Sequence, residues 1–158
     1  MTRAFGRAMK GKRVVDYAPH GHWHTTTLVA AITWESAIAP MVLDGPMDRI
    51  AFEAYVEHVL IPELPPDAIV VMDNLSAHKS PKIDHLLQAA GAQLRYLPPY
   101  SPDFNPIELM WSKVKNALRS AKARTQEELW NATATALTQI TSTDTQGFFR
   151  HCFVGIIT

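Results

Sequence analysis

The amino-acid sequence predicts an α/β domain in which a mixed β-sheet is flanked by helices. Segments rich in β-branched residues dominate the first third of the chain, and helical periodicity then alternates with short apolar runs. The length of 158 residues accommodates one compact domain. With 47% hydrophobic residues and a formal net charge of zero, the composition excludes a disordered chain and disfavours a strongly basic nucleic-acid coat.

The first third of the chain predicts an antiparallel meander of three strands. Residues 13–17 form a short candidate strand, and residues 24–34 predict a longer, well-buried one that is rich in β-branched residues. Residues 37–45 predict the third strand. Pro40 inside this segment indicates an edge position or a bulge, because proline cannot donate to a β-ladder.

Helices and strands alternate from Asp48 onward. Apolar residues at helical spacing predict a helix that continues to a stop at Pro62 and Pro65. The continuous apolar run at residues 67–74 predicts a central strand buried on both faces. Later segments predict a helix, a strand and two helices, at residues 81–90, 92–98, 106–121 and 126–140, before a short C-terminal turn or helix. Antiparallel strands followed by such units are typical of a ribonuclease-H-type domain.

The neutral total charge conceals two clusters of cations that contain no acidic residue. The first cluster is Arg3, Arg7, Lys10, Lys12 and Arg13, and the second is Lys113, Lys115, Arg119, Lys122 and Arg124. Each cluster is explained either by a solvated surface or by contacts with phosphates. The single cysteine excludes an intramolecular disulfide framework, and no apolar stretch reaches the ~20 residues of a membrane span. We therefore expect no membrane partner and a cytoplasmic location.

Two carboxylates occupy positions suited to chemistry. Asp73 stands at the end of the predicted central strand, where open α/β sheets place their ligands. Glu108 begins the helix at residues 106–121 and shares one helical face with Ser112, Lys115 and Arg119. Carboxylates from separate elements can hold Mg²⁺, and cations along the same face can contact a phosphate backbone. The alternatives are that Asp73 only starts a turn and that Glu108 only forms a capping box with Asn105.

Histidines suggest a second, weaker possibility. His20, His22 and His24 have a spacing at which zinc ligands occur, but a polar loop before a strand explains them as well. His78 lies five residues after Asp73, close enough to approach the same site. It either orients a water or a phosphate there or is a surface residue before the next helix.

Two motif blocks resemble the catalytic domain of mariner-superfamily transposases from bacterial insertion sequences. The blocks are VVMDNLSAHKS at residues 70–80 and LRYLPPYSPDFNPIELMWSKVKNALRS at residues 94–120. Weaker similarity extends over most of residues 13–120. The resemblance implies a ribonuclease-H-like fold and an Asp-Asp-Glu triad that binds two Mg²⁺ or Mn²⁺ ions. It also implies hydrolysis of a phosphodiester at transposon ends, followed by attack of the freed 3′-hydroxyl on target DNA.

The resemblance assigns roles to individual residues. Asp73 corresponds to the second aspartate of the triad and Glu108 to its glutamate, both as catalytic metal ligands. The basic face Lys113, Lys115 and Arg119 is expected to bind DNA. The matching residues expected to shape the site are Asn74, His78, Pro99, Tyr100, Ser101, Pro102, Asn105 and Pro106. DNA is the implied partner, and the intact transposase is expected to be a homodimer.

The first aspartate of the triad has no counterpart in a matching context. In the family it lies on the opening strand, upstream of the segment that resembles residues 4–11, and neither Asp16 nor Asp44 replaces it. We therefore expect a chain truncated at its N-terminus, loss of the first strand and impaired catalysis. The expected organisation is a basic leader at 1–12, a catalytic domain at 13–123 and a helical extension at 124–158. The alternative function is a non-catalytic DNA-binding or dimerising remnant.

Overall fold

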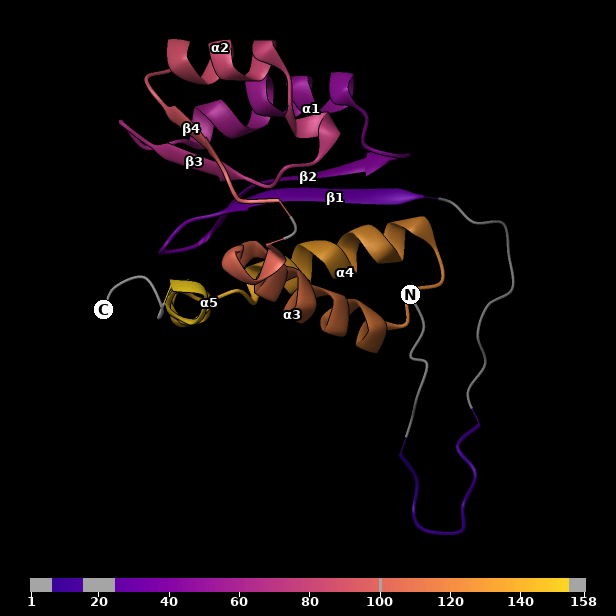
Figure 1. Cartoon of the computed structure of the whole chain (residues 1–158). Helices are drawn as coiled ribbons and strands as arrows, with labels where there is room; N and C mark the ends of the chain where they lie inside the picture. The colour runs from indigo at the N-terminus through magenta and orange to yellow at the C-terminus, as the bar shows by residue number, and fades with distance from the viewer. Residues whose placement is uncertain (1–6, 16–24, 100, 154–158) are drawn as a thin grey trace.

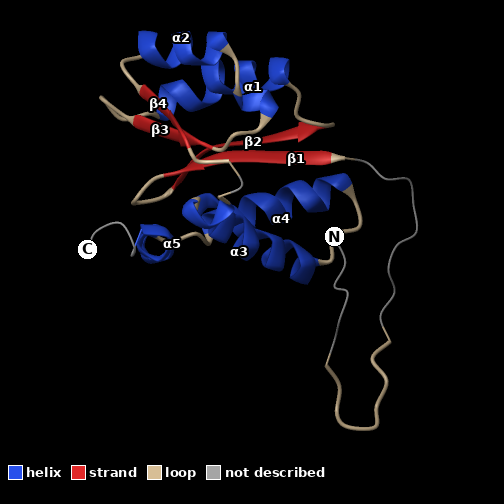
Figure 2. Ribbon diagram, in the orientation of Figure 1, coloured by secondary structure: helices blue, strands red, loops and turns tan. Residues whose placement is uncertain are grey.

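The computed structural model of the chain describes residues 7–15, 25–99 and 101–153. Figure 1 shows strands in a middle layer, with helices α1 and α2 on one side and helices α3, α4 and α5 on the other. Figure 2 shows the same arrangement by type of secondary structure. The predicted combination of strands flanked by helices is therefore confirmed. No helix in the described part of the chain is long and apolar enough to cross a membrane.

The strands β1 (Thr26–Ile32) and β2 (Ala37–Asp44) form an antiparallel hairpin. The ladder shifts register between Val29 and Ala31, where the two residues Ala39 and Pro40 oppose one residue of β1. Pro40 thus lies at a bulge in an edge strand, as predicted. All seven residues of β1 are only partly buried, so the prediction of a well-buried strand is wrong.

The first predicted strand does not form over its described residues. Residues 13–15 are irregular and exposed, and residues 16 and 17 lie outside the described residues. The side chains of Val14 and Val15 are 45% and 69% exposed, respectively. Their apolar character alone does not create a strand, because no described neighbour buries them.

Helix α1 (Arg49–Tyr55) begins at Asp48, whose side chain accepts a hydrogen bond from the Ala51 backbone N–H at 2.8 Å. The helical path continues through a π-helical turn and a short 3₁₀ turn to Glu63. Pro62 lies in that last turn, which confirms the predicted end of the helix. Local capping and proline chemistry therefore determine both ends of this segment.

The strands β3 (Ile69–Met72) and β4 (Gln93–Tyr96) pair in parallel and are joined by α2 (Pro81–Ala89). The Ser80 side chain caps α2 by accepting from the Lys82 backbone N–H. β3 is not buried on both faces, because Ile69 and Val71 are 62% and 52% exposed. One face of β3 packs under α1 and α2, whereas its other face has no described element against it at these two residues.

The C-terminal third of the chain is helical. Helix α3 (Pro106–Ala121) and helix α4 (Gln126–Thr138) confirm the two predicted helices, and the predicted short C-terminal turn or helix is the helix α5 (Ser142–Phe153). α3 contacts both α4 and α5 as well as β1. The Thr125 side chain and Glu128 form a capping box at the start of α4.

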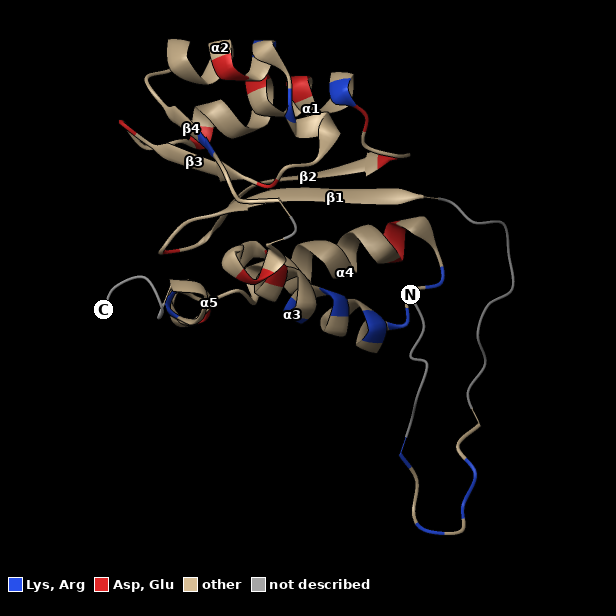
Figure 3. Ribbon diagram, in the orientation of Figure 1, with Lys and Arg blue, Asp and Glu red and all other residues tan. Residues whose placement is uncertain are grey.

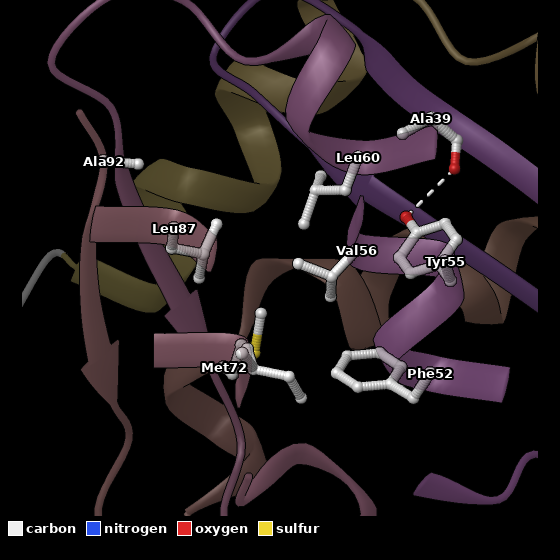
Figure 4. Close-up of a cluster of buried hydrophobic side chains, with 9 residues drawn as sticks. Ala39, Phe52, Tyr55, Val56, Leu60, Met72, Leu87 and Ala92 are labelled. Carbon is white, nitrogen blue, oxygen red and sulfur yellow. Dashed lines mark hydrogen bonds between the residues drawn. The ribbon is translucent and has the colours of Figure 1, made fainter. Parts of the chain in front are cut away.

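Two hydrophobic clusters lie on opposite sides of the strands. One lies between β2, β3 and the helices α1 and α2, and Figure 4 shows several of its side chains. The other joins α3 and α4 through Met110, Val114, Leu118 and Ala136. Leu28, Ala30 and Ile32 of β1 pack on this second cluster, while Val29 and Ala31 pack on the first. β1 therefore separates the two cores.

The expected mixed sheet is divided into two halves. β1 pairs only with β2, and β3 pairs only with β4, among the residues that the structure describes. The first half is antiparallel and the second is parallel. Both kinds of pairing are present, as predicted, but no described strand connects β1 to β3.

Candidate active site

Asp73 follows directly after β3. Its Oδ1 atom accepts a hydrogen bond from the Leu75 backbone N–H at 3.1 Å, which is the pattern of an Asx turn. The turn-forming role considered for Asp73 is therefore present. The side chain remains 38% exposed, so its carboxylate is also accessible to a ligand.

Glu108 lies in the first turn of α3, but it does not cap the helix. Asn105 occupies the N-cap position, and its side chain makes no capping hydrogen bond. The capping box predicted as the alternative role of Glu108 is therefore not formed; only its backbone N–H donates to the Asn105 carbonyl, at 3.1 Å. The exposed Glu108 carboxylate makes no hydrogen bond or ion pair with any described residue. It is free to bind a cation.

One cavity of about 580 Å³ brings these residues together. Asp73 reaches it from the end of β3, whereas Asn105, Glu108 and Trp111 reach it from α3 and the residue before it. Figure 3 shows acidic residues at the end of β3 and at the start of α3. Within the described ranges no three histidine, cysteine or acidic side chains are grouped closely enough to hold a metal ion. The two carboxylates thus share a cavity without completing a three-ligand cluster.

His78 also lines this cavity, from the short 3₁₀ turn Ser76–His78. Its ring stacks on Phe52 of α1, with 4.1 Å between the ring centroids. Its Nδ1 atom lies 2.6 Å from Oδ1 of Asp73. The contact lacks the alignment of a hydrogen bond, so Nδ1 is a buried polar atom with no hydrogen-bond partner among the described residues. The sequence did not predict that Phe52 stacks on His78, because the helical spacing of Phe52 indicates only a core residue.

The loop after β4 is held by one hydrogen bond from the segment after β3 and by one within the loop. The Asn74 side chain donates to the Leu97 carbonyl, and the Ser101 hydroxyl donates to the Pro99 carbonyl at 3.3 Å. The segment Pro102–Phe104 forms a 3₁₀ turn, and Pro106 is the first residue of α3. The hydrogen bond from Asn74 connects the loop to the end of β3, whereas the bond from Ser101 lies within the loop. Tyr100 lies outside the described residues.

The basic face of α3 is only partly available to a ligand. The Lys113 ammonium forms an ion pair with Asp144 at 2.5 Å and donates to the Gln139 carbonyl at 3.4 Å. Lys113 therefore connects α3 to the segment that begins α5. Lys115 and Arg119 are exposed on the face that also carries Glu108, and Figure 3 shows the cations along α3.

Several sequence candidates fall outside the described residues. These are Asp16, the histidines His20, His22 and His24, and Arg3 of the first basic cluster. Arg7, Lys10, Lys12 and Arg13 of that cluster are described and exposed. Asp44 is the last residue of β2.

Comparisons with known proteins identify the family of the chain. The family model of the DDE superfamily endonuclease matches residues 1–130. The transposable element Tcb1 transposase of Caenorhabditis briggsae is 30% identical over 83 residues, a match that covers 50% of this chain and 30% of that protein. The chain therefore spans less than a third of the curated relative it matches.

Solved structures show the same fold. The Mos1 strand transfer complex matches with a TM-score of 0.75 at 14% identity, over 96% of this chain and 47% of that chain. The Mos1 mariner paired end complex with Mn matches with a TM-score of 0.72 at 13% identity, over 93% of this chain and 46% of that chain. The ribonuclease-H-like fold predicted from the sequence is thus confirmed. Because the family model covers well over half of its length, the chain belongs to the DDE superfamily endonucleases.

Proposed function

We propose that the chain acts in DNA transposition, through metal-dependent cleavage and transfer of DNA strands at transposon ends. The observation that carries this proposal is the free carboxylate of Glu108 on the same cavity as Asp73. The Asx turn leaves Asp73 accessible, and the missing capping box leaves Glu108 accessible. The similarity to proteins named transposases supports DNA as the partner.

The residues present suit Mg²⁺ or Mn²⁺. Both ions prefer hard oxygen ligands, and Mg²⁺ is commonly held by one or two carboxylates together with water and substrate phosphates. Asp73 and Glu108 supply such carboxylates from two separate elements. The unpaired Nδ1 atom of His78 beside Asp73 is a further polar group for which a hydrated ion would provide a partner. A two-ion site would activate the attacking oxygen and stabilise the leaving one.

The chain's own side chains position this chemistry. Asp73 and Glu108 would bind the metal. His78 lies against the carboxylate of Asp73 and limits the orientations that this carboxylate can adopt. Asn74 fixes the turn after β3 to the segment after β4, so the cavity wall keeps its shape. Pro99, Ser101, Pro102, Asn105 and Pro106 belong to the loop that leads into α3, and Tyr100 lies within the same stretch of sequence.

Lys115 and Arg119 would position the DNA. They lie on the exposed face of α3 beyond Glu108, so they can contact backbone phosphates of a DNA strand that extends from the cavity along this helix. Lys113 would contribute less, because its ammonium is already paired with Asp144. The proposal includes a homodimer as the working assembly of the intact enzyme, on the basis of the family resemblance.

We propose that this chain alone cleaves DNA only slowly. Two carboxylates meet at the cavity among the described residues, whereas a DDE triad has three. With one ligand fewer, the negative charge that develops during phosphodiester cleavage is less well neutralised. The organisation into residues 1–12, 13–123 and 124–158 remains part of the proposal.

A nicking assay on DNA that carries the transposon ends tests the function. The purified chain is incubated with supercoiled DNA and Mn²⁺, and we expect slow nicking that Asp73→Asn and Glu108→Gln each abolish. Glu127→Gln, on the exposed face of α4, is the matched control and should leave nicking unchanged. Nicking that persists in both site variants would contradict the assignment. DNA binding without any nicking would support the non-catalytic alternative.

A further inference from the structure

Two adjacent residues of α1 hold residues 78–80, which connect the preceding 3₁₀ turn to α2. The Phe52 ring stacks on the His78 ring, with 4.1 Å between the centroids. The Oε1 atom of Glu53 accepts a hydrogen bond from the Ser80 hydroxyl at 2.5 Å. The first and the last residue of this short segment are therefore both attached to α1.

Glu53 is a fixed acceptor rather than a solvated surface charge. Its side chain is only 16% exposed, and a carboxylate in such a position is costly unless it is paired and hydrogen-bonded. The cations of Arg49 and Lys82 each lie 3.9 Å from one of its oxygens, and Ser80 supplies the hydrogen bond. Glu57 lies one turn later on the same helical path, but its side chain is 38% exposed and its described ion pair is with Lys82 alone.

The Ser80 hydroxyl transmits this attachment to the backbone. Its Oγ atom donates to Glu53 and accepts from the Lys82 backbone N–H at 3.3 Å, which caps α2. A hydroxyl has a single hydrogen, so the bond to Glu53 directs the lone pairs of Ser80 toward the helix. Ser80 is 7% exposed, so water has little access to these bonds. The position of Ser80 is therefore fixed from two sides.

His78 lies two residues before this fixed point. Its backbone carbonyl accepts from the Tyr96 hydroxyl at 3.0 Å, and Lys79 has a non-helical φ of −95° and ψ of 87°. Two residues span at most ~7 Å, so a shift of Ser80 displaces the His78 ring. The Nδ1 atom of that ring lies 2.6 Å from Oδ1 of Asp73. A contact this short tolerates little displacement.

We infer that Glu53 is a positioning residue for the metal site: its hydrogen bond with Ser80 holds residues 78–80 so that the His78 ring lies against Asp73. The inference rests on the proposed function, to which the metal site itself belongs. Glu53 is not one of the described residues that line the cavity, so it acts on the site through Ser80 and His78. The alternative is a purely structural role, in which Glu53 only ties α1 to α2.

Three variants separate positioning from stability. Glu53→Met fills a similar volume but cannot accept a strong hydrogen bond from Ser80. Glu53→Gln loses the charge but keeps an oxygen acceptor at the same reach, so it should preserve the position of His78. Glu57→Met is the matched control, because it removes a carboxylate that pairs with Lys82 from the same helical path.

The position of His78 is measured first without metal, by NMR of its ring protons at one fixed pH. Phe52 stacks on this ring, and protons over an aromatic face resonate upfield of those in an exposed histidine. We expect Glu53→Met to move the His78 signal at least halfway to that of the exposed His85. Glu53→Gln and Glu57→Met should leave it in place. A His78 signal that Glu53→Met does not move would overturn the inference.

The affinity for Mn²⁺ measures the consequence for the metal site. Groups that orient a metal ligand typically contribute about 10- to 100-fold to metal affinity, so Glu53→Met should weaken binding about tenfold. Glu53→Gln and Glu57→Met should bind normally. An equal loss in Glu53→Gln would contradict the role of the hydrogen bond.

A double variant tests whether Glu53 acts through His78. Added to His78→Ala, Glu53→Met should cause little further loss of Mn²⁺ affinity, because the effects of residues that act through one another are not additive. Additive losses would contradict the inference.

The two readouts fail separately. If the unmodified chain binds no Mn²⁺ through Asp73, the proposed function fails, while displacement of the His78 ring in Glu53→Met still supports the hold of Glu53 on that ring. If Mn²⁺ binds through Asp73 and the ring stays in place in Glu53→Met, the inference fails and the proposed function stands. If Glu53→Met does not fold, Ser80→Gly removes the donor and keeps an acceptable N-cap residue. The same displacement of the ring is then expected, and an unmoved ring would overturn the inference.

Discussion

The Nδ1 atom of His78 lies 2.6 Å from Oδ1 of Asp73, and the same imidazole ring stacks on Phe52 of α1. The His78 backbone carbonyl accepts a hydrogen bond from the Tyr96 hydroxyl at 3.0 Å. The ring is therefore held by a neighbouring helix, and its backbone is held by β4. This arrangement limits the orientations available to the carboxylate of Asp73.

Removing the His78 ring tests this restriction. Groups that orient a metal ligand typically contribute about 10- to 100-fold to metal affinity. We expect His78→Ala to weaken binding of Mn²⁺ by at least about tenfold, measured by the loss of the free-ion signal in electron paramagnetic resonance. His85→Ala, on the exposed face of α2, is the control and should leave the affinity unchanged. Equal affinities for the two variants would contradict the positioning role of His78.

The ion pair between Lys113 and Asp144 predicts a pH-dependent stability. The hydrogen bond from Lys113 and the hydrogen bonds from Thr141 lower the pKa of Asp144 from 3.8 to about 2. A carboxyl group whose pKa is lower in the folded state stabilises the fold at pH values above its pKa in the unfolded chain. This contribution is lost as the pH falls from about 4 to about 2. Because both side chains are partly exposed, solvent screening limits it to about 1 kcal/mol.

Lys113→Met measures that contribution. Its free energy of unfolding should be lower than that of the unmodified chain near pH 6, and the difference should shrink between pH 4 and pH 2. Denaturant titrations at each pH give the comparison. Lys115→Met is the control, and a difference for Lys113→Met that stays constant down to pH 2 would contradict the role of the ion pair.

Tyr55 stabilises the bulge in β2. Its hydroxyl donates to the Ala39 carbonyl at 3.0 Å, as Figure 4 shows, while Glu63 accepts from the Ala39 N–H at 2.9 Å. Ala39 is fully buried and has a φ of 50°, so side chains replace the ladder bonds that the bulge disrupts. Burial, and then the charge of Glu63, raises the pKa of Tyr55, which keeps the hydroxyl protonated as a donor.

We expect Tyr55→Phe to lower the free energy of unfolding by about 1–3 kcal/mol, because it leaves a buried carbonyl without a partner. Thermal or denaturant unfolding measures the change. Tyr96→Phe is the comparison, since Tyr96 is 40% exposed and water can replace its hydrogen bond. A loss for Tyr55→Phe no larger than that for Tyr96→Phe would refute the explanation.

The cations of α3 predict a salt-dependent affinity for DNA. Lys115→Ala and Arg119→Ala should each weaken binding and reduce the slope of log affinity against log salt by about one. Lys113→Ala should have a smaller effect, because Lys113 is paired with Asp144. Lys82→Ala, on α2 and paired with Glu57, is the control. Salt titrations monitored by fluorescence anisotropy of labelled DNA give the slopes.

Local signals in the sequence predict the helices well. Ser80 and Pro81 start α2 as expected, and Gly91, with a φ of 77°, follows its end. Asn105 and Pro106 likewise mark the start of α3. These features depend on residues within a few positions of one another, so the chemistry that fixes them is visible in the sequence.

Features that depend on distant segments could not be predicted. Hydrophobicity indicates that β3 is buried on both faces, but burial of Ile69 and Val71 requires a neighbour that the apolar run itself does not specify. Lys113 belongs to a basic face in sequence, yet its partner Asp144 lies 31 residues away. The sequence at Asn105 and Glu108 fits a capping box, but the Asn105 side chain makes no capping hydrogen bond.

Binding of Mn²⁺ to the chain tests the central claim that Asp73 and Glu108 form one metal site. Electron paramagnetic resonance titrations compare the unmodified chain with Asp73→Asn, Glu108→Gln and the control Glu127→Gln. We predict that each site variant loses most of the affinity, that the double variant loses little more than either single variant, and that the control binds normally. Independent, additive losses for the two site variants, or unchanged binding in both, would contradict a shared site.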